Sequence, residues 1–241
     1  MNRVLAMIVA GIFVLTVGCG TQSYEKRLEK TIENINYQKR LNANLTDAPA
    51  KGKLEELQIY LRPPKNMTGP TETFKLAVVE PGRFDLESSF IEPEKQSLHL
   101  LARVERPKTP TNKAPTPAET VPPGDFNAEV VDLVKSVYGV ELDVGQFKED
   151  NRRENTFRSK TIDLNEKTVQ VYLYGGKNSP HKVALIFEYP KTERNAVDPK
   201  IALCLESFAV GERARRAFAG GDVEEEESEG PTEDASPAGV L

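Results

Sequence analysis

The sequence predicts an α+β domain, an antiparallel sheet flanked by helices, with an N-terminal helix, a proline-rich loop and a disordered acidic tail. Three apolar segments, 157–164, 168–174 and 181–189, follow one another with short turns between them, which is typical of an antiparallel meander. Segments 126–138 and 198–218 each carry one apolar face at helical spacing. Because a sheet face and a helix face must both be buried, the helices are expected to cover the sheet.

Alternation along the meander predicts which side chains face the core. In 168–174, Val169, Val171 and Leu173 share one face, because successive side chains of a strand point to opposite sides. The apolar positions of 181–189 alternate in the same way. Short turns between alternating strands indicate that the meander buries one face only.

Local signals mark the ends of the predicted helices. Asp125 precedes 126–138, and its carboxylate is suited to accept from free amides of the first turn. Gly139 ends that helix. Segment 198–218 is predicted to be one continuous helix with arginines in its last turns, where cations suit the helix dipole. The polar run 150–155 is predicted to be a turn.

The first half of the domain contributes further strands. Segment 54–62 is the predicted first strand, and Pro63 and Pro64 end it because proline has no amide for the ladder. Segment 74–79 is a candidate short strand, and 97–105 alternates most clearly in this half.

The segment 21–45 is predicted to be a helix, since it lacks glycine and proline and carries an apolar stripe at helical spacing. The stripe consists of Tyr24, Leu28, Ile32 and Ile35. Two interpretations remain: a coiled-coil or partner-binding helix that projects from a membrane, or a helix that docks on its own domain or forms a semi-ordered stalk. A stripe shorter than three heptads favours the second.

Two segments are poor in residues that could build a core. Residues 106–124 contain six prolines and are expected to form an extended spacer. Residues 219–241 are expected to be disordered. Eight of the 37 acids lie in the last twenty residues, so the rest of the chain carries 29 acids against 32 bases. Neither this near-neutral body nor the acidic tail suggests nucleic-acid binding, which needs a strongly basic face.

The residue types that usually carry catalysis or bind metals are scarce. The chain has two histidines, His99 and His181, and two cysteines, Cys19 and Cys204. Both histidines are interpreted as surface residues of strands, and Cys204 as a small buried apolar side chain. No usual zinc ligand set can be assembled from them, and no hydrolase or phosphate-loop motif is present. We therefore predict no enzyme activity, no cofactor, no metal site and no catalytic residue.

The first twenty residues have the pattern of an export signal. Arg3 precedes an uncharged apolar run at 4–17, and Gly18 stands directly before Cys19, a run too short for a typical spanning helix. This end resembles the signal peptide and lipobox of bacterial lipoproteins. The resemblance implies removal of residues 1–18 and lipidation of Cys19 with fatty acids such as palmitate. The alternative is an ordinary cleaved signal in which Cys19 is incidental.

That resemblance implies a location and a division of the chain. The protein is expected at the cell membrane or the outer membrane, anchored by lipid and facing the periplasm or the exterior. Residues 19–52 would form the lipidated cysteine and a helical stalk, and 53–218 the α+β domain, in which 106–124 is an insertion.

The order of elements in 53–218 resembles the PsbP-like fold. An early strand running into Pro63, Pro64 and Lys65, the meander at 157–189 and a closing helix around 205–208 carry the resemblance. It implies an antiparallel sheet flanked by helices, in a family that includes small binding and assembly-accessory proteins. A shared fold does not by itself assign a function.

Two functions remain open on these grounds. The first is a membrane-anchored lipoprotein of the cell envelope that acts as an interaction or assembly-accessory protein, with an envelope protein as its partner. The alternative is a module that binds a small ligand or a lipid.

Overall fold

The computed structural model describes residues 21–47, 52–71, 73–80, 82–105, 124–175 and 179–220. The predicted signal peptide, Cys19, the acidic tail from residue 221 and the proline-rich insertion up to residue 123 lie outside the described residues. The chain divides into two units, Met1–Asn44 and Leu45–Leu241. In the part that the structure describes, no helix combines the length and the apolar character needed to cross a bilayer.

The first unit contains one described element, the helix α2 (Thr21–Asn44). Its bounds match the predicted helix within one residue. The four side chains of the predicted stripe are exposed, with Tyr24 at 67% and Leu28, Ile32 and Ile35 at just under half. The helix is therefore confirmed, while the choice between a docked and a projecting helix stays a prediction.

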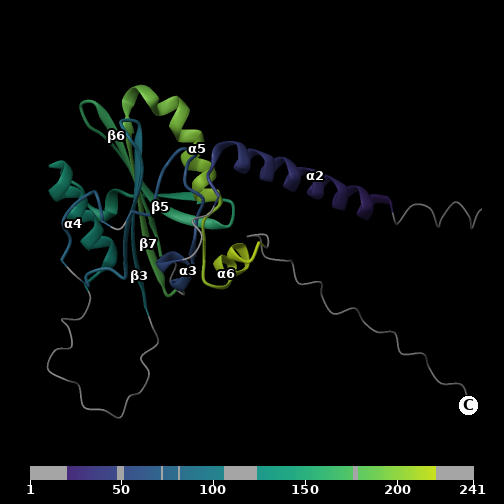
Figure 1. The fold of residues 1–241 in the computed structure, drawn as a ribbon, viewed down its shortest axis with the longest axis horizontal. Coiled ribbons are helices and arrows are strands. Elements are labelled where there is room, and N and C mark those ends of the chain that lie inside the picture. Colours follow the sequence, from purple (N-terminus) through teal and green to yellow (C-terminus); the bar gives the residue numbers. More distant parts are fainter. Residues whose placement is uncertain are drawn as a thin grey trace, which may run out of the picture. The chain divides into compact units, whose positions relative to one another are not determined.

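The second unit is built on a six-stranded antiparallel sheet with strand order β2-β3-β7-β6-β5-β4, which confirms the predicted α+β class (Figure 1). The strands are β2 (Leu86–Glu92), β3 (Gln96–Val104), β4 (Lys148–Arg152), β5 (Asn155–Asp163), β6 (Lys167–Tyr174) and β7 (His181–Pro190). The meander β5–β6–β7 and strand β3 lie where the sequence predicted them.

Helices lie on both sides of this sheet (Figure 1). Helix α4 lies on one side, and α5 and α6 lie on the other. The helices and short turns are α3 (Lys53–Glu56), α4 (Phe126–Tyr138), η1 (Val144–Gln146), η2 (Lys191–Glu193), α5 (Arg194–Glu206) and α6 (Glu212–Phe218). A second, two-stranded sheet pairs β1 (Ile59–Tyr60) with β8 (Ala209–Val210).

Helix α4 follows its predicted local signals. The Asp125 carboxylate accepts a hydrogen bond of 3.0 Å from the Asn127 amide, which satisfies one of the free donors of the first turn. At the other end, Gly139 adopts φ 64 and ψ 36, a left-handed conformation that glycine adopts without a steric penalty.

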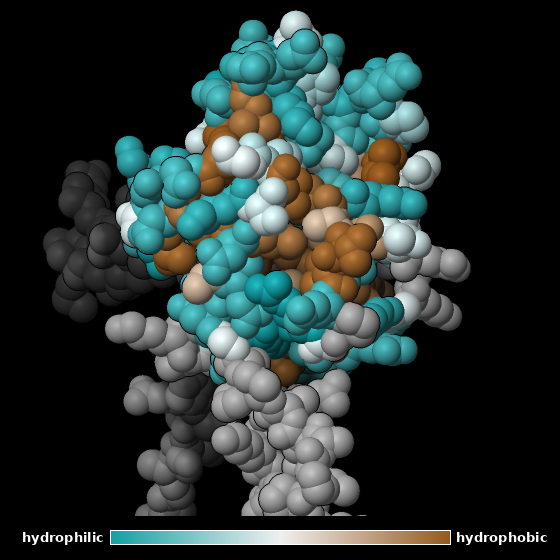
Figure 2. Space-filling view, turned by 90° about the vertical axis from the view of Figure 1, so that its left-hand side faces the viewer, coloured by the Kyte–Doolittle hydropathy of each residue, from teal (hydrophilic) through white to brown (hydrophobic). Residues whose placement is uncertain are grey.

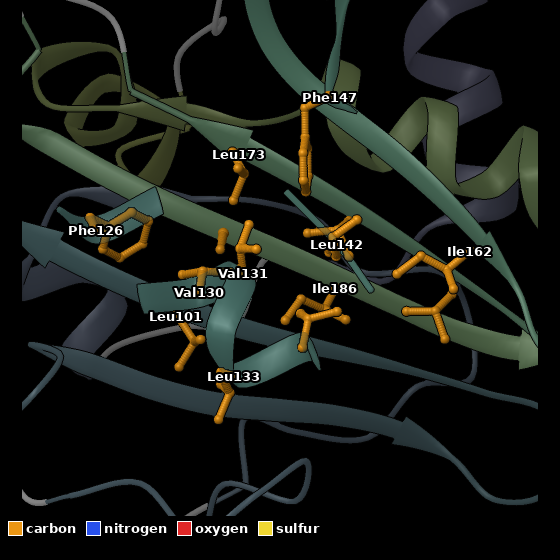
Figure 3. Close-up of a cluster of buried hydrophobic side chains, with 14 of the residues drawn as sticks. Leu101, Phe126, Val130, Val131, Leu133, Leu142, Phe147, Ile162, Leu173 and Ile186 are labelled. Carbon is orange, nitrogen blue, oxygen red and sulfur yellow. The ribbon is translucent and has the colours of Figure 1, made fainter. Parts of the chain in front are cut away.

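The sheet is buried on both faces, so the prediction of a single buried face was wrong. On the α4 side, Val130 and Val131 share a cluster with Leu101 and Ile186 (Figure 3). On the other side, Tyr172 of β6 is 6% exposed. An alternating pattern identifies two faces, but only the placement of α5 and α6 decides that the second is covered as well.

Two predicted strands of the first half were also wrong. Segment 54–62 contributes most of the short helix α3 and only two residues of strand, Ile59 and Tyr60. This strand, β1, is short because its partner β8 also has only two residues. The described residues of 74–79 form no strand. The strand β2 was missed, as was β4, whose residues 150–152 had been interpreted as part of a turn.

The predicted C-terminal helix 198–218 is interrupted. Helix α5 begins earlier, at Arg194, and ends at Glu206. The chain then turns to place β8 beside β1, and the Gly211 amide donates to the Gln58 carbonyl at 2.9 Å. Gly211 has φ 64, which ends the strand and allows α6 to start in a new direction.

Candidate binding cleft

A cleft of about 1270 Å³ lies at one end of the main sheet, where five segments of the second unit meet. Its lining residues come from the segment before β2, the β2–β3 turn, the end of α4, the β5–β6 turn and the end of β7: Lys75, Leu76, Ile91, Glu92, Glu94, Lys95, Gln96, Ser97, His99, Val137, Tyr138, Gly139, Val140, Asp163, Leu164, Asn165, Glu166, Lys167, Glu188, Tyr189 and Pro190.

Glu188, at the end of β7, is the centre of a polar cluster in this cleft. Its carboxylate accepts from the Tyr138 hydroxyl at 2.6 Å and from the Lys167 ammonium at 2.8 Å. The Lys167 Nζ also lies 5.2 Å from the centroid of the Tyr138 ring, which places the cation over the negative face of the aromatic system. Three elements, α4, β6 and β7, are held together here.

These contacts set the protonation of the cluster. Burial acts to raise the pKa of Glu188, but the hydrogen bonds from Lys167 and Tyr138 outweigh it and hold that pKa below its ordinary value. Burial, reinforced by the Glu188 carboxylate, raises the pKa of Tyr138. At neutral pH, Glu188 is therefore an ionised acceptor and Tyr138 a neutral donor. The two hydrogen bonds to Glu188 hold the side chains of Tyr138 and Lys167 in place.

His99 lines the cleft from β3 and is 4% exposed. Its Nδ1 lies 2.9 Å from the Ser89 hydroxyl, and that hydroxyl accepts from the Lys75 amide at 3.0 Å. Burial lowers the pKa of His99 to about 4, so the ring is neutral at physiological pH.

A hydrogen-bonded serine and histidine invite comparison with hydrolytic enzymes, but this pair lacks the necessary access. Ser89 has no exposed surface, and a nucleophile must reach its substrate. The Ser89 hydroxyl connects β2, the Lys75 backbone and His99. We assign this pair a packing role.

Half-buried apolar side chains border the cleft. Leu76, Val137, Val140 and Leu164 line it and pack against the core beneath α4. Seen from the side on which α4 lies, apolar surface gathers in the middle of the face, with polar residues around it (Figure 2). An apolar patch with a polar border on a folded domain is typical of a contact surface.

The charges around the cleft are not balanced. Three lysines stand against five acids among the lining residues, Lys75, Lys95, Lys167, Glu92, Glu94, Asp163, Glu166 and Glu188. Lys167 is paired with Glu188, Lys95 with Glu92 at 3.2 Å, and Asp163 with Arg194 of α5 at 3.6 Å. Glu94 and Glu166 are exposed, so the border offers negative charge to a partner.

The residues singled out from the sequence lie largely elsewhere. Cys19 is outside the described residues. Cys204 is fully buried and burial raises its pKa, which confirms its predicted role as a buried apolar side chain. The prediction that both histidines are surface residues was wrong: His181 is 6% exposed, and its Nε2 lies 2.9 Å from the Leu57 carbonyl oxygen.

Among the residues that the structure describes, no group of three or more His, Cys, Asp or Glu side chains is placed to hold a metal ion. Sequence reasoning missed the Tyr138–Lys167–Glu188 cluster. Its members are up to 50 positions apart and belong to no motif. Locally, Tyr138 and Glu188 lie at or near the ends of predicted elements and Lys167 in a predicted turn, which does not bring the three together.

Comparison with known proteins adds a likeness of fold. No family model matches the chain, and no curated protein matches it. The chain is similar to the solution structure of cyanobacterial PsbP (CyanoP) from Synechocystis sp. PCC 6803, with 11% sequence identity, coverage of 70% of this chain and 94% of that chain, and a TM-score of 0.42. At this identity the likeness concerns the fold alone and says nothing of what this chain binds.

Proposed function

We propose that this chain is a lipid-anchored protein of the cell envelope whose α+β domain docks an apolar, net-basic segment of another envelope protein in the cleft beside α4. The observation that carries the proposal is the cleft itself, bordered by half-buried apolar side chains and an excess of acids. The anchor is supported by the run of Arg3, the apolar segment 4–17 and Gly18–Cys19.

The size of the cleft favours a protein segment over a small molecule. Pockets for small ligands usually enclose about 300 to 1000 Å³, and this cleft measures about 1270 Å³. Several of its lining residues are exposed, among them Glu94, Lys95, Asn165 and Glu166. The alternative, binding of a small ligand or lipid, predicts that such a ligand raises the melting temperature of the domain.

The internal pairing of charges supports docking with little reorganisation. Glu188 is already neutralised by Lys167 and hydrogen-bonded by Tyr138, so a partner does not need to supply a buried counter-charge. The apolar side chains supply contact area, and the exposed acids orient a basic partner and speed its association.

Replacing Cys19 by serine is expected to release the protein from the membrane fraction, because two or more acyl chains are needed for stable anchoring and the variant carries none. The measurement is fractionation of cells that express the wild-type chain or Cys19→Ser, with the mass of the mature N-terminus determined in each. A wild-type mature chain that begins at Cys19 without acyl mass would instead establish an ordinary cleaved signal.

Reversing two exposed acids of the cleft is expected to weaken partner capture roughly tenfold, because it replaces attraction by repulsion at the border. The tagged double variant Glu94→Lys/Glu166→Lys is compared with the wild type by affinity capture from gently solubilised membranes. The matched control is Glu55→Lys/Glu56→Lys, the same change of charge on two exposed residues of α3 outside the cleft.

The pattern of capture decides the proposal. A partner retained by the wild type and by the α3 control, but lost from the cleft variant, supports docking at this site. Equal capture by all three forms excludes the cleft as the docking site. If the wild-type bait is recovered alone, the interaction role itself is contradicted.

A further inference from the structure

Four of the five large apolar side chains that are exposed in the described part of the chain form one stripe on α2. Tyr24, Leu28, Ile32 and Ile35 lie within about 80° of one another around the helix axis, and all four are exposed. Exposure of such a surface to water is unfavourable, since removing one methylene group from water stabilises the protein by about 0.8 kcal/mol. An occupant for this face is therefore expected.

The stripe is confined to the part of α2 nearest the proposed anchor. Only Gly20 separates Cys19 from Thr21, where the helix begins. The last residue of the stripe, Ile35, lies about 21 Å further along the axis at 1.5 Å per residue. Beyond it, the same face carries Lys39 and Asn42, so the stripe ends on this face, while Leu41 on another face is buried.

The face opposite the stripe is strongly charged. Within residues 24–35 it carries three bases and three acids: Lys26, Arg27, Lys30, Glu25, Glu29 and Glu33. The segment therefore has no net charge, and the apolar side chains have to supply its affinity for a membrane. A helix that combines an apolar stripe with a strongly charged face is typical of segments that lie in the plane of a membrane interface, and tyrosine is enriched at that depth.

A second copy of the chain fits this stripe less well. The four residues span less than two heptads, whereas stable coiled coils need about three or four. A lipid anchor at Cys19 would in contrast hold the stripe beside the membrane at high effective concentration, so a weak apolar contact becomes populated without any other partner.

We propose that the first half of α2 lies along the membrane surface, with Tyr24, Leu28, Ile32 and Ile35 inserted at the boundary between lipid headgroups and acyl chains. This inference rests on the proposed anchor at Cys19. It assigns α2 the role of a membrane-surface helix, in place of the stalk or the docked helix that the sequence suggested.

The absence of tryptophan from the chain provides a direct test. A single tryptophan is introduced on the stripe by Ile32→Trp or, as the matched control on the opposite face, by Glu33→Trp. Each chain, beginning at Cys19, is coupled through the Cys19 thiol to a maleimide lipid in vesicles of phosphatidylcholine and phosphatidylglycerol. Cys204 is fully buried, so it does not compete for coupling to the folded protein.

The readout is tryptophan emission with and without brominated lipids. The proposal expects that Ile32→Trp emits at shorter wavelength and is quenched by brominated lipid, and that Glu33→Trp shows neither effect. These effects should persist when the vesicles carry one chain each.

Three results would overturn the proposal. If the tryptophan of Ile32→Trp emits at the long wavelength typical of a tryptophan in water, the stripe stays in solvent. A shift to shorter wavelength without quenching would mean that protein covers it. Loss of the shift on dilution to one chain per vesicle would identify a second copy as the occupant. Because chemical coupling supplies the anchor, each result is independent of whether the cell lipidates Cys19.

Discussion

Phe157→Ala is expected to lower the free energy of unfolding by about 3 to 5 kcal/mol, the range measured when a buried phenylalanine is truncated. Phe157 has no exposed surface. Its ring centroid lies 5.5 Å from that of Phe208, 5.8 Å from that of Tyr174 and 6.1 Å from that of Tyr172. The substitution leaves a cavity between β5, β6 and the segment that connects α5 with β8.

The measurement is urea denaturation followed by circular dichroism, with the free energy taken from the midpoint and slope. Phe157→Leu should cost much less, because it keeps most of the buried volume. Val78→Ala is the control for truncation as such: Val78 is fully exposed, and its replacement should change stability by less than about 0.5 kcal/mol. A loss below about 1 kcal/mol for Phe157→Ala would contradict the assigned core.

Acidification is expected to destabilise the fold through His99 even before the carboxylates titrate. Burial lowers the pKa of His99 from 6.5 to about 4, so the unfolded chain binds a proton in this range that the native state excludes. The contribution of His99 to stability is therefore fully present at a pH above its pKa in the unfolded chain. This contribution is lost as the pH falls towards 4. The loss from this one group amounts to about 2 kcal/mol between about pH 7 and pH 5.

Burial is the main reason why protonation of His99 is unfavourable. Nδ1 lies 2.9 Å from the Ser89 hydroxyl, whose oxygen accepts from the Lys75 amide. In the charged ring both nitrogens are donors, so each would need an acceptor in this buried site. Among neighbouring charges, the Glu188 carboxylate favours the protonated ring and the Lys167 ammonium opposes it, so burial decides the direction.

His99→Asn isolates this contribution. The asparagine side chain keeps an acceptor for Ser89 but does not titrate, so the variant should lose about 2 kcal/mol less than the wild type between about pH 7 and pH 5. His181, whose pKa is also lowered by burial, remains in both proteins and cancels in the comparison. Identical pH dependence of the two proteins would show that His99 does not titrate as described.

Elements with strong local signals were predictable from the sequence. Helix α4 has a periodic apolar face, Asp125 to accept from its first turn and Gly139 to end it. The strands β3, β5, β6 and β7 are bounded by turn residues and coincide with their predicted ranges within one or two positions. In each case the signal consists of residues within the element or next to it, so local conformational preferences are enough to predict the element.

Elements that exist only through their partners were not predictable. Strand β4 has the sequence KEDNR, without an apolar residue, and it is a strand because Lys148 to Arg152 pair with β5. The break between α5 and α6 has the same origin. A continuous helix from 198 to 218 agrees with local propensity, but pairing of β8 with β1 needs the chain to turn at Gly211.

The candidate cleft required the tertiary structure for the same reason. Tyr138 and Glu188 are 50 residues apart in sequence, yet their oxygen atoms are 2.6 Å apart. His99 was interpreted as a surface residue because alternation does not reveal what lies above a sheet. It is buried, and it faces the cleft beside the same cluster.

Local patterns in the sequence were enough to predict the α+β class, the meander, the helices α2 and α4, the burial of Cys204 and a lipid anchor at Cys19. All of these depend on residues close together in the chain. The folded structure was needed to show that both faces of the sheet are covered, that β4 and β8 are strands, and that Tyr138, Lys167, Glu188 and His99 share one cleft. These features arise from contacts between distant segments, whose free energy depends on the packing of the whole domain and not on any local pattern.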